Sequence, residues 1–136
     1  MDNPHLTFHH FGLAVKRPAE AVALVSSLGY TVGPTVLDPL QNVHLALCAH
    51  VSAPAVEIIW PANSGGPVDK LAQRHSSGII YHLCYETDNL AAALSRLEQA
   101  GLKAVCISSP TPAPLFDGRK VSFYNVVGIG LVEILE

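Results

Sequence analysis

Hydrophobic and polar positions alternate along the first strand-like segment of the chain, "TFHHFGLAV" at residues 7–15. Phe11, Leu13 and Val15 fall on one side of this segment, whereas His10 falls on the other. Such alternation is typical of a β-strand with one buried face. Apolar residues then recur at helical spacing over 18–28, between a proline suited to a first turn and a glycine suited to a stop. The pattern therefore predicts a strand followed by a helix.

The remaining elements are predicted from the same signals. In the first half we expect short strands near residues 30–34, 42–50 and 54–60. In the second half we expect a strand in "GIIYHLCYE", a helix at 89–100 with Asp88 as N-cap and Gly101 as its stop, and strands near 102–107, 119–126 and 129–135. Between the halves, "NSGGPVDKLAQRH" predicts a turn and a short linking helix at about 64–76.

The two halves are copies of one unit. An ungapped alignment of residues 10–32 with residues 82–104 places His10 over His82, and "VEII" matches "VEIL" so that Glu57 lies over Glu133. The extra residues of the second half fall in the loop around "SSPTPAPLFDG". An internal repeat determines the architecture. We therefore expect a single α+β domain over 1–136, in which two βαβββ modules, at about 5–61 and 78–136, form a curved mixed sheet around a shared cup.

Composition narrows the class of protein. The 136 residues are 49% hydrophobic and 14% charged, with a net charge of −3, so the chain can bury a substantial core. Lys and Arg form no long run, which argues against nucleic-acid binding. No apolar run approaches the roughly 20 residues that cross a bilayer, and the start is not typical of a secretory signal. The cysteines, Cys48, Cys84 and Cys106, lack CxxC spacing, which favours reduced thiols in a cytoplasmic protein.

Strand alternation places four polar residues in the cup. In "AVEIIWP", Glu57 points away from Val56 and Ile58, and His10 points away from the helix-packing face of its strand. The repeat then places His82 and Glu133 at the equivalent positions. A single histidine or glutamate in a strand is more often structural, but four that match under a repeat indicate a binding site. Two buried carboxylates need compensation, and a mixed imidazole and carboxylate set suits Zn, Mn, Fe, Co or Ni.

Other residues are candidates for contacts with substrate. Alternation in "NVHLALCAH" predicts that His44 faces the cup, where it either exchanges protons near neutral pH or only forms hydrogen bonds. In "FDGRKVSFY", Arg119 and Lys120 are candidates to bind a carboxylate or phosphate, although surface basic pairs are more often simply solvated. Ser122 and Tyr124 are predicted to face the cup and to orient substrate.

The motifs "HFGLAV", "VEIIWP", "YHLCYETDNL" and "GIGLVEI" resemble those of the vicinal oxygen chelate superfamily, and the similarity covers nearly the whole chain. The resemblance implies a cup that holds one divalent ion, Zn, Co, Mn or Ni. It assigns as ligands His10, Glu57, His82 and Glu133. Within the superfamily, "H-x-G-x-A-V" and the segment "GGPVDKLAQRHSSGIIYHLCYETDN" are most similar to the methylmalonyl-CoA epimerase family, which more often has Gln at the position of Glu57.

The resemblance implies a metal-dependent isomerase that shifts a proton at the carbon next to a carbonyl, with an acyl thioester as substrate. It also implies that Glu133 serves as one base. The epimerases have a glutamate as second base, and His44 is the candidate here to replace it, with binding of substrate as the alternative. A glyoxalase I-like lyase that acts on a thiol–aldehyde adduct is the alternative, because that enzyme uses the same ligand types. A metal-free drug-binding module and an extradiol-type oxygenase fit the complete ligand set less well. Exposed strand edges favour a homodimer.

Overall fold

The computed structural model describes residues 5–63 and 65–136, which divide into two compact units. The first unit comprises described residues from 10 to 81, and the second comprises residues 82–136 together with residues 5–9. Three α-helices and nine β-strands make up the described chain, so the α+β class is confirmed. No helix of the described residues has the length and apolar character needed to span a bilayer.

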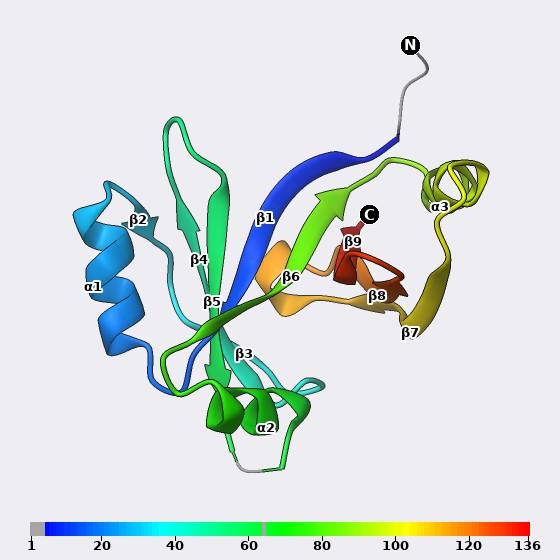
Figure 1. Ribbon diagram of the computed structural model, residues 1–136. Helices are drawn as coiled ribbons and strands as arrows, with labels where there is room; N and C mark the ends of the chain where they lie inside the picture. The colour runs from blue at the N-terminus through cyan, green and yellow to red at the C-terminus, as the bar shows by residue number, and fades with distance from the viewer. Residues whose placement is uncertain (1–4, 64) are drawn as a thin grey trace. The chain divides into compact units, whose positions relative to one another are not determined.

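The first unit contains most of β1 and the elements up to α2 (Figure 1). These elements are β1 (Thr7–Ala14), α1 (Ala19–Ser27), β2 (Thr31–Val32), β3 (Val36–Asp38), β4 (Val43–Ala49), β5 (Ala55–Pro61) and α2 (Pro67–Arg74). Strand β1 runs parallel to β5, which pairs antiparallel with β4, and β4 pairs with both β2 and β3. The sequence pattern did not predict β3, because three residues between two turns are too few to show alternation.

The second unit repeats this plan. It contains β6 (Ile79–Glu86) from His82 onwards, α3 (Leu90–Gln99), β7 (Ala104–Pro112), the short 3₁₀ turn η1 (Pro114–Phe116), β8 (Lys120–Val126) and β9 (Gly130–Leu135). Strand β6 runs parallel to β9, and β9, β8 and β7 pair antiparallel in that order. Register shifts between Cys106 and Thr111 allow β7 to run to Pro112. The predicted strand ended at residue 107 because the following serines and prolines are typical of a loop.

Helices α1 and α3 each cover one face of the sheet in their own unit. In the first unit, Ala21 and Val25 of α1 form a buried cluster with Val56 and Ile58 of β5, and Phe11 and Leu13 pack against it. In the second unit, Leu90 and Leu94 of α3 pack against a buried cluster that includes Val132 and Ile134. The apolar alternation predicted for β1 and β5 is therefore confirmed, and each unit has a second sheet face that α1 or α3 does not cover.

The helix ends agree with the predicted positions, with one exception. Gly29 and Gly101 follow α1 and α3 with φ of 91° and 79°, a left-handed conformation that glycine adopts without strain. The N-cap of α3, however, is Asn89, whose Oδ1 accepts a hydrogen bond from the backbone N of Ala92 at 3.0 Å. The prediction of Asp88 as N-cap was wrong by one residue, because either side chain can accept this bond.

The start of β1 packs with the second half of the chain. Leu6 packs against the α3-side cluster, and the Phe8 ring meets the Tyr85 ring edge-on at a centroid distance of 5.5 Å. His9 meets Phe116 edge-on at 5.6 Å. These contacts explain why the boundary between the units falls inside β1 rather than in the linker that the sequence suggests.

Candidate metal centre

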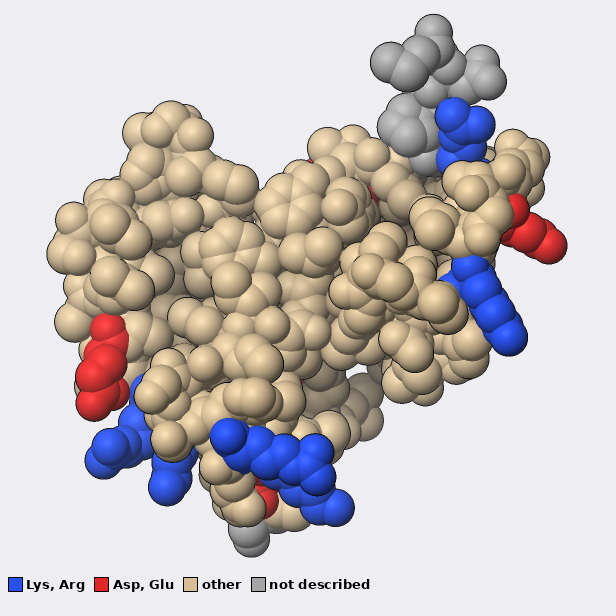
Figure 2. All heavy atoms as spheres, in the orientation of Figure 1, with Lys and Arg blue, Asp and Glu red and all other residues tan. Residues whose placement is uncertain are grey.

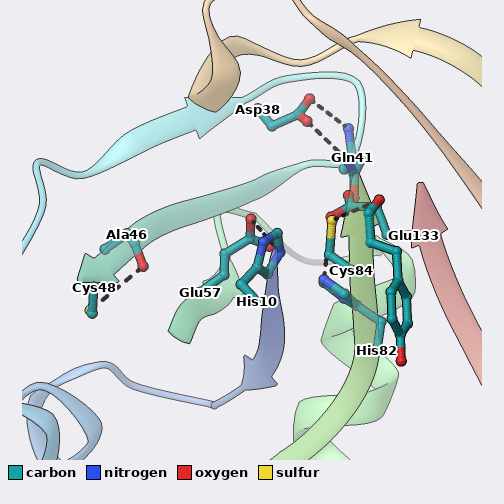
Figure 3. Close-up of polar contacts among 10 residues, drawn as sticks. His10, Asp38, Gln41, Ala46, Cys48, Glu57, His82, Cys84 and Glu133 are labelled. Atoms are coloured by element: carbon teal, nitrogen blue, oxygen red, sulfur yellow. Dashed lines mark hydrogen bonds and ion pairs between the residues drawn. The ribbon is translucent and has the colours of Figure 1, made fainter. Parts of the chain in front are cut away.

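The first unit places His10 and Glu57 side by side on the sheet face that α1 leaves open. In the parallel β1–β5 ladder, Gly12 is the partner of Glu57, so His10 is one alternation away on the same face. His10 Nε2 lies 3.4 Å from Glu57 Oε2, and the two residues are 0% and 3% exposed. Figure 3 shows the imidazole of His10 turned toward the carboxylate of Glu57.

The second unit contains an equivalent pair. Cys84 is the partner of Glu133 in the β6–β9 ladder, and His82 is one alternation away, as His10 is from Gly12. His82 Nε2 lies 3.5 Å from Glu133 Oε1, and the residues are 2% and 3% exposed. The sheet-face assignments made from the sequence for these four residues are therefore confirmed within each unit.

The geometry of each pair fits two ligands of one metal ion. Ligand nitrogen and oxygen atoms lie about 2.0–2.2 Å from a divalent ion such as Zn²⁺, so two ligands at a tetrahedral angle are about 3.4 Å apart. The measured separations are 3.4 Å for His10–Glu57 and 3.5 Å for His82–Glu133, longer than a good N–H···O hydrogen bond. Each of the four residues offers one atom that can bind a metal ion, a ring nitrogen of histidine or a carboxylate oxygen of glutamate.

His44 does not lie on the face that carries Glu57. In the antiparallel β4–β5 ladder, His44 is the partner of Trp60, and the two rings lie 5.6 Å apart between centroids. Partners in such a ladder share a face, and Trp60 packs with the α1 side of the sheet. The prediction that His44 faces the cup was wrong. The β4 sequence is apolar on both faces, so alternation alone could not fix the direction.

Cys48 follows the same corrected alternation. It is the partner of Val56 and belongs to the buried cluster under α1. Burial raises the pKa of the Cys48 thiol, and a hydrogen bond with the backbone of Gly33 offsets this in part. A buried thiol with a raised pKa is a poor nucleophile, so Cys48 has a packing role.

Ser122 and Tyr124 also lie on the helix-covered face. Their partners in the β8–β9 ladder are Ile134 and Val132, which pack with α3. The predicted cup-side orientation of both residues was therefore wrong, for the same reason as in β4: β8 has bulky residues on both faces. By the same alternation Lys120, the first residue of β8, belongs to that face, although it is exposed.

Two residues that the sequence analysis did not single out lie next to the carboxylates. Leu47 is the partner of Glu57, and Phe123 is the partner of Glu133. The edge of the Phe123 ring meets the His82 ring at a centroid distance of 5.8 Å and an angle of 85°. The repeat aligns Leu47 with Phe123 and so predicts that both face the same side, but only the strand pairing shows which side that is.

Arg119 has a partner within the protein. Its Nη2 lies 3.2 Å from Oε2 of Glu86, and its Nε donates a hydrogen bond of 2.8 Å to the backbone oxygen of Glu136. Both charged side chains are partly exposed, and such surface pairs contribute about 0–1 kcal/mol. Arg119 is therefore held at the edge of the second unit. An anion could replace Glu86 as its partner at little energetic cost.

Residues 9–123 match the family described as the glyoxalase/bleomycin resistance protein/dioxygenase superfamily. The chain belongs to this superfamily. Among curated members, it is 27% identical over 103 residues to an ethylmalonyl-CoA/methylmalonyl-CoA epimerase of Cereibacter sphaeroides, an alignment that covers 75% of this chain and 76% of the relative. Membership agrees with the resemblance that the sequence motifs indicate.

Solved structures of the glyoxalase-like superfamily share the fold. Methylmalonyl-CoA epimerase from Mycobacterium tuberculosis has a TM-score of 0.80 at 19% identity, covering 100% of this chain and 91% of that one. A variant of the Streptomyces coelicolor methylmalonyl-CoA epimerase in complex with 2-nitronate-propionyl-CoA has a TM-score of 0.72 at 19% identity, covering 96% of both chains. The likeness extends over both repeats, and the glyoxalase-like fold is confirmed.

Proposed function

We propose that this chain is an epimerase of the methylmalonyl-CoA type, which moves a proton at the carbon next to the carbonyl of an acyl thioester. The observation that supports this most directly is the matched occurrence of a buried His–Glu pair in each repeat. The family membership and the name of the Cereibacter sphaeroides relative support the same reaction. The acyl-CoA analogue bound to the Streptomyces coelicolor enzyme supports a thioester as substrate.

We further propose that the four residues of the two pairs hold a single divalent ion. Zn, Co, Mn and Ni all suit two imidazoles and two carboxylates. When bound, such an ion would stabilise the negative charge that develops on the carbonyl oxygen. Each pair is almost completely buried, so its electrostatic effect is stronger than it would be in water.

Glu133 is assigned as one proton-transfer group. Its carboxylate lies beside the His82 imidazole, Phe123 is its partner on the neighbouring strand, and it is 3% exposed, so little water reaches it. Epimerisation needs a second group, and the position of His44 beside Trp60 removes it from this role. Glu57 has the equivalent position in the other repeat, so we assign the second proton transfer to Glu57.

Exchange of the substrate α-proton in D₂O tests the proposal. Metal-loaded protein should incorporate deuterium into methylmalonyl-CoA, and Glu133→Gln should slow exchange by about 10²- to 10⁴-fold, the usual effect of losing a general base. Metal content is measured in the same samples to separate loss of the base from loss of the ion. No exchange by metal-loaded wild-type protein would refute the function.

The glyoxalase I-like reaction is the second candidate, because Glu57 completes a set of two histidines and two carboxylates. Incubation of the same metal-loaded protein with a glutathione–methylglyoxal adduct distinguishes the two. Formation of the 2-hydroxyacyl thioester, without α-proton exchange in methylmalonyl-CoA, would assign the chain to the glyoxalase reaction instead.

Assembly and location complete the proposal. We propose a homodimer, because the edge strand β7 exposes Val105 and Ile107. Light scattering during gel filtration should give twice the mass of the chain.

We also propose a cytoplasmic location, since Cys48, Cys84 and Cys106 are all free thiols. Arg119 remains a candidate for the free carboxylate of the substrate, and Lys120 for a more distant anionic group.

A further inference from the structure

Four cationic side chains gather at one end of the first unit. Residues 10–81 contain four Lys or Arg residues, which are all exposed: Lys16, Arg17, Lys70 and Arg74. We call this set the cationic cluster. Figure 2 shows Lys and Arg side chains concentrated over α2 and the neighbouring end of the unit, at the bottom of the view.

The backbone explains why residues so distant in sequence lie together. Ala14 is the partner of Ile59, and the backbone N of Val15 donates a hydrogen bond of 2.9 Å to the oxygen of Ile59. Lys16 and Arg17 therefore leave β1 where β5 ends and the chain turns toward α2. The chain returns from α2 at Gly78, where an added Cβ would lie 3.3 Å from Val15 Cγ1. Lys70 and Arg74 are one helical turn apart on α2.

The cluster has an excess of positive charge. In the described part of the chain, none of its four members forms an ion pair, in contrast to Arg119 with Glu86. The neighbouring carboxylate of Asp69 already accepts hydrogen bonds from the backbone N of Gly65 at 3.2 Å and from Gln73 Nε2 at 3.3 Å. Of the other acids of residues 10–81, Asp38 and Glu57 are buried, so Glu20 of α1, which is exposed, is the second carboxylate at the surface of this unit. Four cations against these two carboxylates leave a surface that attracts anions.

We propose that the cationic cluster binds the nucleotide phosphates of coenzyme A. This inference rests on the proposed function, because only an acyl-CoA substrate carries a diphosphate and a 3′-phosphate at a distance from its thioester. Strands β1 and β5 carry the His10–Glu57 pair, and the chain continues from the end of β1 into Lys16 and Arg17 of the cluster. From His10 to Lys16, an extended chain covers about 20 Å, and the flexible pantetheine arm of coenzyme A bridges the gap. Arg and Lys are the side chains that bind phosphate groups best.

Calorimetry with adenosine 3′,5′-bisphosphate, which lacks the arm and the thioester, tests the site without catalysis. The wild-type protein should bind it with an affinity that falls as ionic strength rises. The double variant Lys70→Ala/Arg74→Ala should weaken binding about tenfold. The matched control Arg96→Ala/Lys103→Ala removes the same charge from exposed positions of the second unit and should leave binding unchanged. Equal losses in both double variants, or no binding by wild type, would overturn the proposal.

A comparison of two thioesters separates this proposal from the proposed function. For the wild-type protein, kcat/KM for α-proton exchange should be about tenfold higher with methylmalonyl-CoA than with methylmalonyl-pantetheine. In Lys70→Ala/Arg74→Ala the two values should become nearly equal, with the pantetheine ester unaffected. If neither ester exchanges while the bisphosphate still binds, the function fails and the site stands. If the protein binds an acidic acyl carrier protein through this cluster and not the bisphosphate, the nucleotide assignment is wrong.

Discussion

Nε2 of His10 lies 3.4 Å from Oε2 of Glu57 in a pair that is almost completely removed from solvent. The same relationship holds between His82 and Glu133 in the second repeat. Burial of a carboxylate lowers the stability of a fold because the charge loses its hydration, and an apolar residue at the same strand position would not have this penalty. Their retention in both repeats is the physical basis of the proposed metal centre, and it leads to measurable consequences.

Replacement of Glu57 by glutamine should separate metal binding from folding. Without metal, we expect Glu57→Gln to leave the free energy of unfolding unchanged or to raise it, because a buried charge is removed at constant volume. Wild-type protein should gain thermal stability on addition of Zn²⁺ or Co²⁺, since a ligand that binds only the folded state stabilises it. The variant should lose most of this gain.

The control for that experiment is Glu20→Gln, which changes an exposed carboxylate in the same unit. It should keep the full metal-dependent rise in Tm. A rise in Tm for Glu57→Gln as large as that of the wild type would show that Glu57 is not a ligand. Thermal scans with and without metal, at several metal concentrations, provide the comparison.

The position of His44 leads to a prediction opposite to the one that the sequence suggests. Because its ring packs against Trp60 on the helix-covered side, His44→Ala should reduce stability by about 1 kcal/mol through lost ring contact, and should leave α-proton exchange within about twofold of wild type. His44→Phe keeps a ring at this position and should recover most of the stability. A large loss of exchange in His44→Ala at unchanged metal content would contradict the corrected orientation.

Phe123 is expected to position His82. The edge of its ring meets the imidazole, which restricts rotation of a proposed ligand. Groups that orient a metal-bound histidine typically change metal affinity by about 10- to 100-fold, and we expect Phe123→Ala to lower it by about tenfold. Phe8→Ala is the matched control, because Phe8 makes an edge-on contact with Tyr85 in the same unit. Competition titrations with a coloured chelator measure both variants, and equal affinities would exclude the positioning role.

The three thiols should differ in reactivity. Cys106 is exposed on the edge strand β7, whereas Cys48 and Cys84 are buried. Burial raises the pKa of Cys48, so its thiolate fraction stays low as the pH rises toward 8. One thiol per folded chain should react rapidly with a disulfide reagent, and Cys106→Ser should abolish this phase. A rapid phase that persists in Cys106→Ser would contradict the burial of the other two.

The sequence predicted the features that depend on a clear pattern. In β1 one face is more apolar than the other, and in β5 Glu57 is the single charged residue of an apolar strand. Alternation therefore placed His10 and Glu57 correctly, and the repeat extended this to His82 and Glu133. In β4 and β8 both faces carry apolar or bulky residues, and pairing with β5 and β9 decides the direction. His44, Ser122 and Tyr124 were misplaced for this reason. The repeat could not reveal the error, because it aligns the misplaced positions of β4 with those of β8.

Other features depend on contacts between distant segments. Packing of Leu6, Phe8 and His9 against the second half moves the unit boundary into β1, and no local pattern encodes such contacts. The gathering of Lys16 and Arg17 near α2 likewise follows from the β1–β5 register, not from any run of charge. The sequence could therefore predict the ligand types and the fold class, but not the surface that the fold assembles around them.

The stoichiometry of metal binding tests the central claim most directly. Metal-free protein titrated with Co²⁺, and analysed for bound metal after removal of excess, should retain one ion per chain, and either His10→Ala or His82→Ala should abolish tight binding. Two ions per chain, with each histidine variant losing only one, would mean that the two repeats act separately. That result, or the absence of any retained ion, would contradict a shared metal centre.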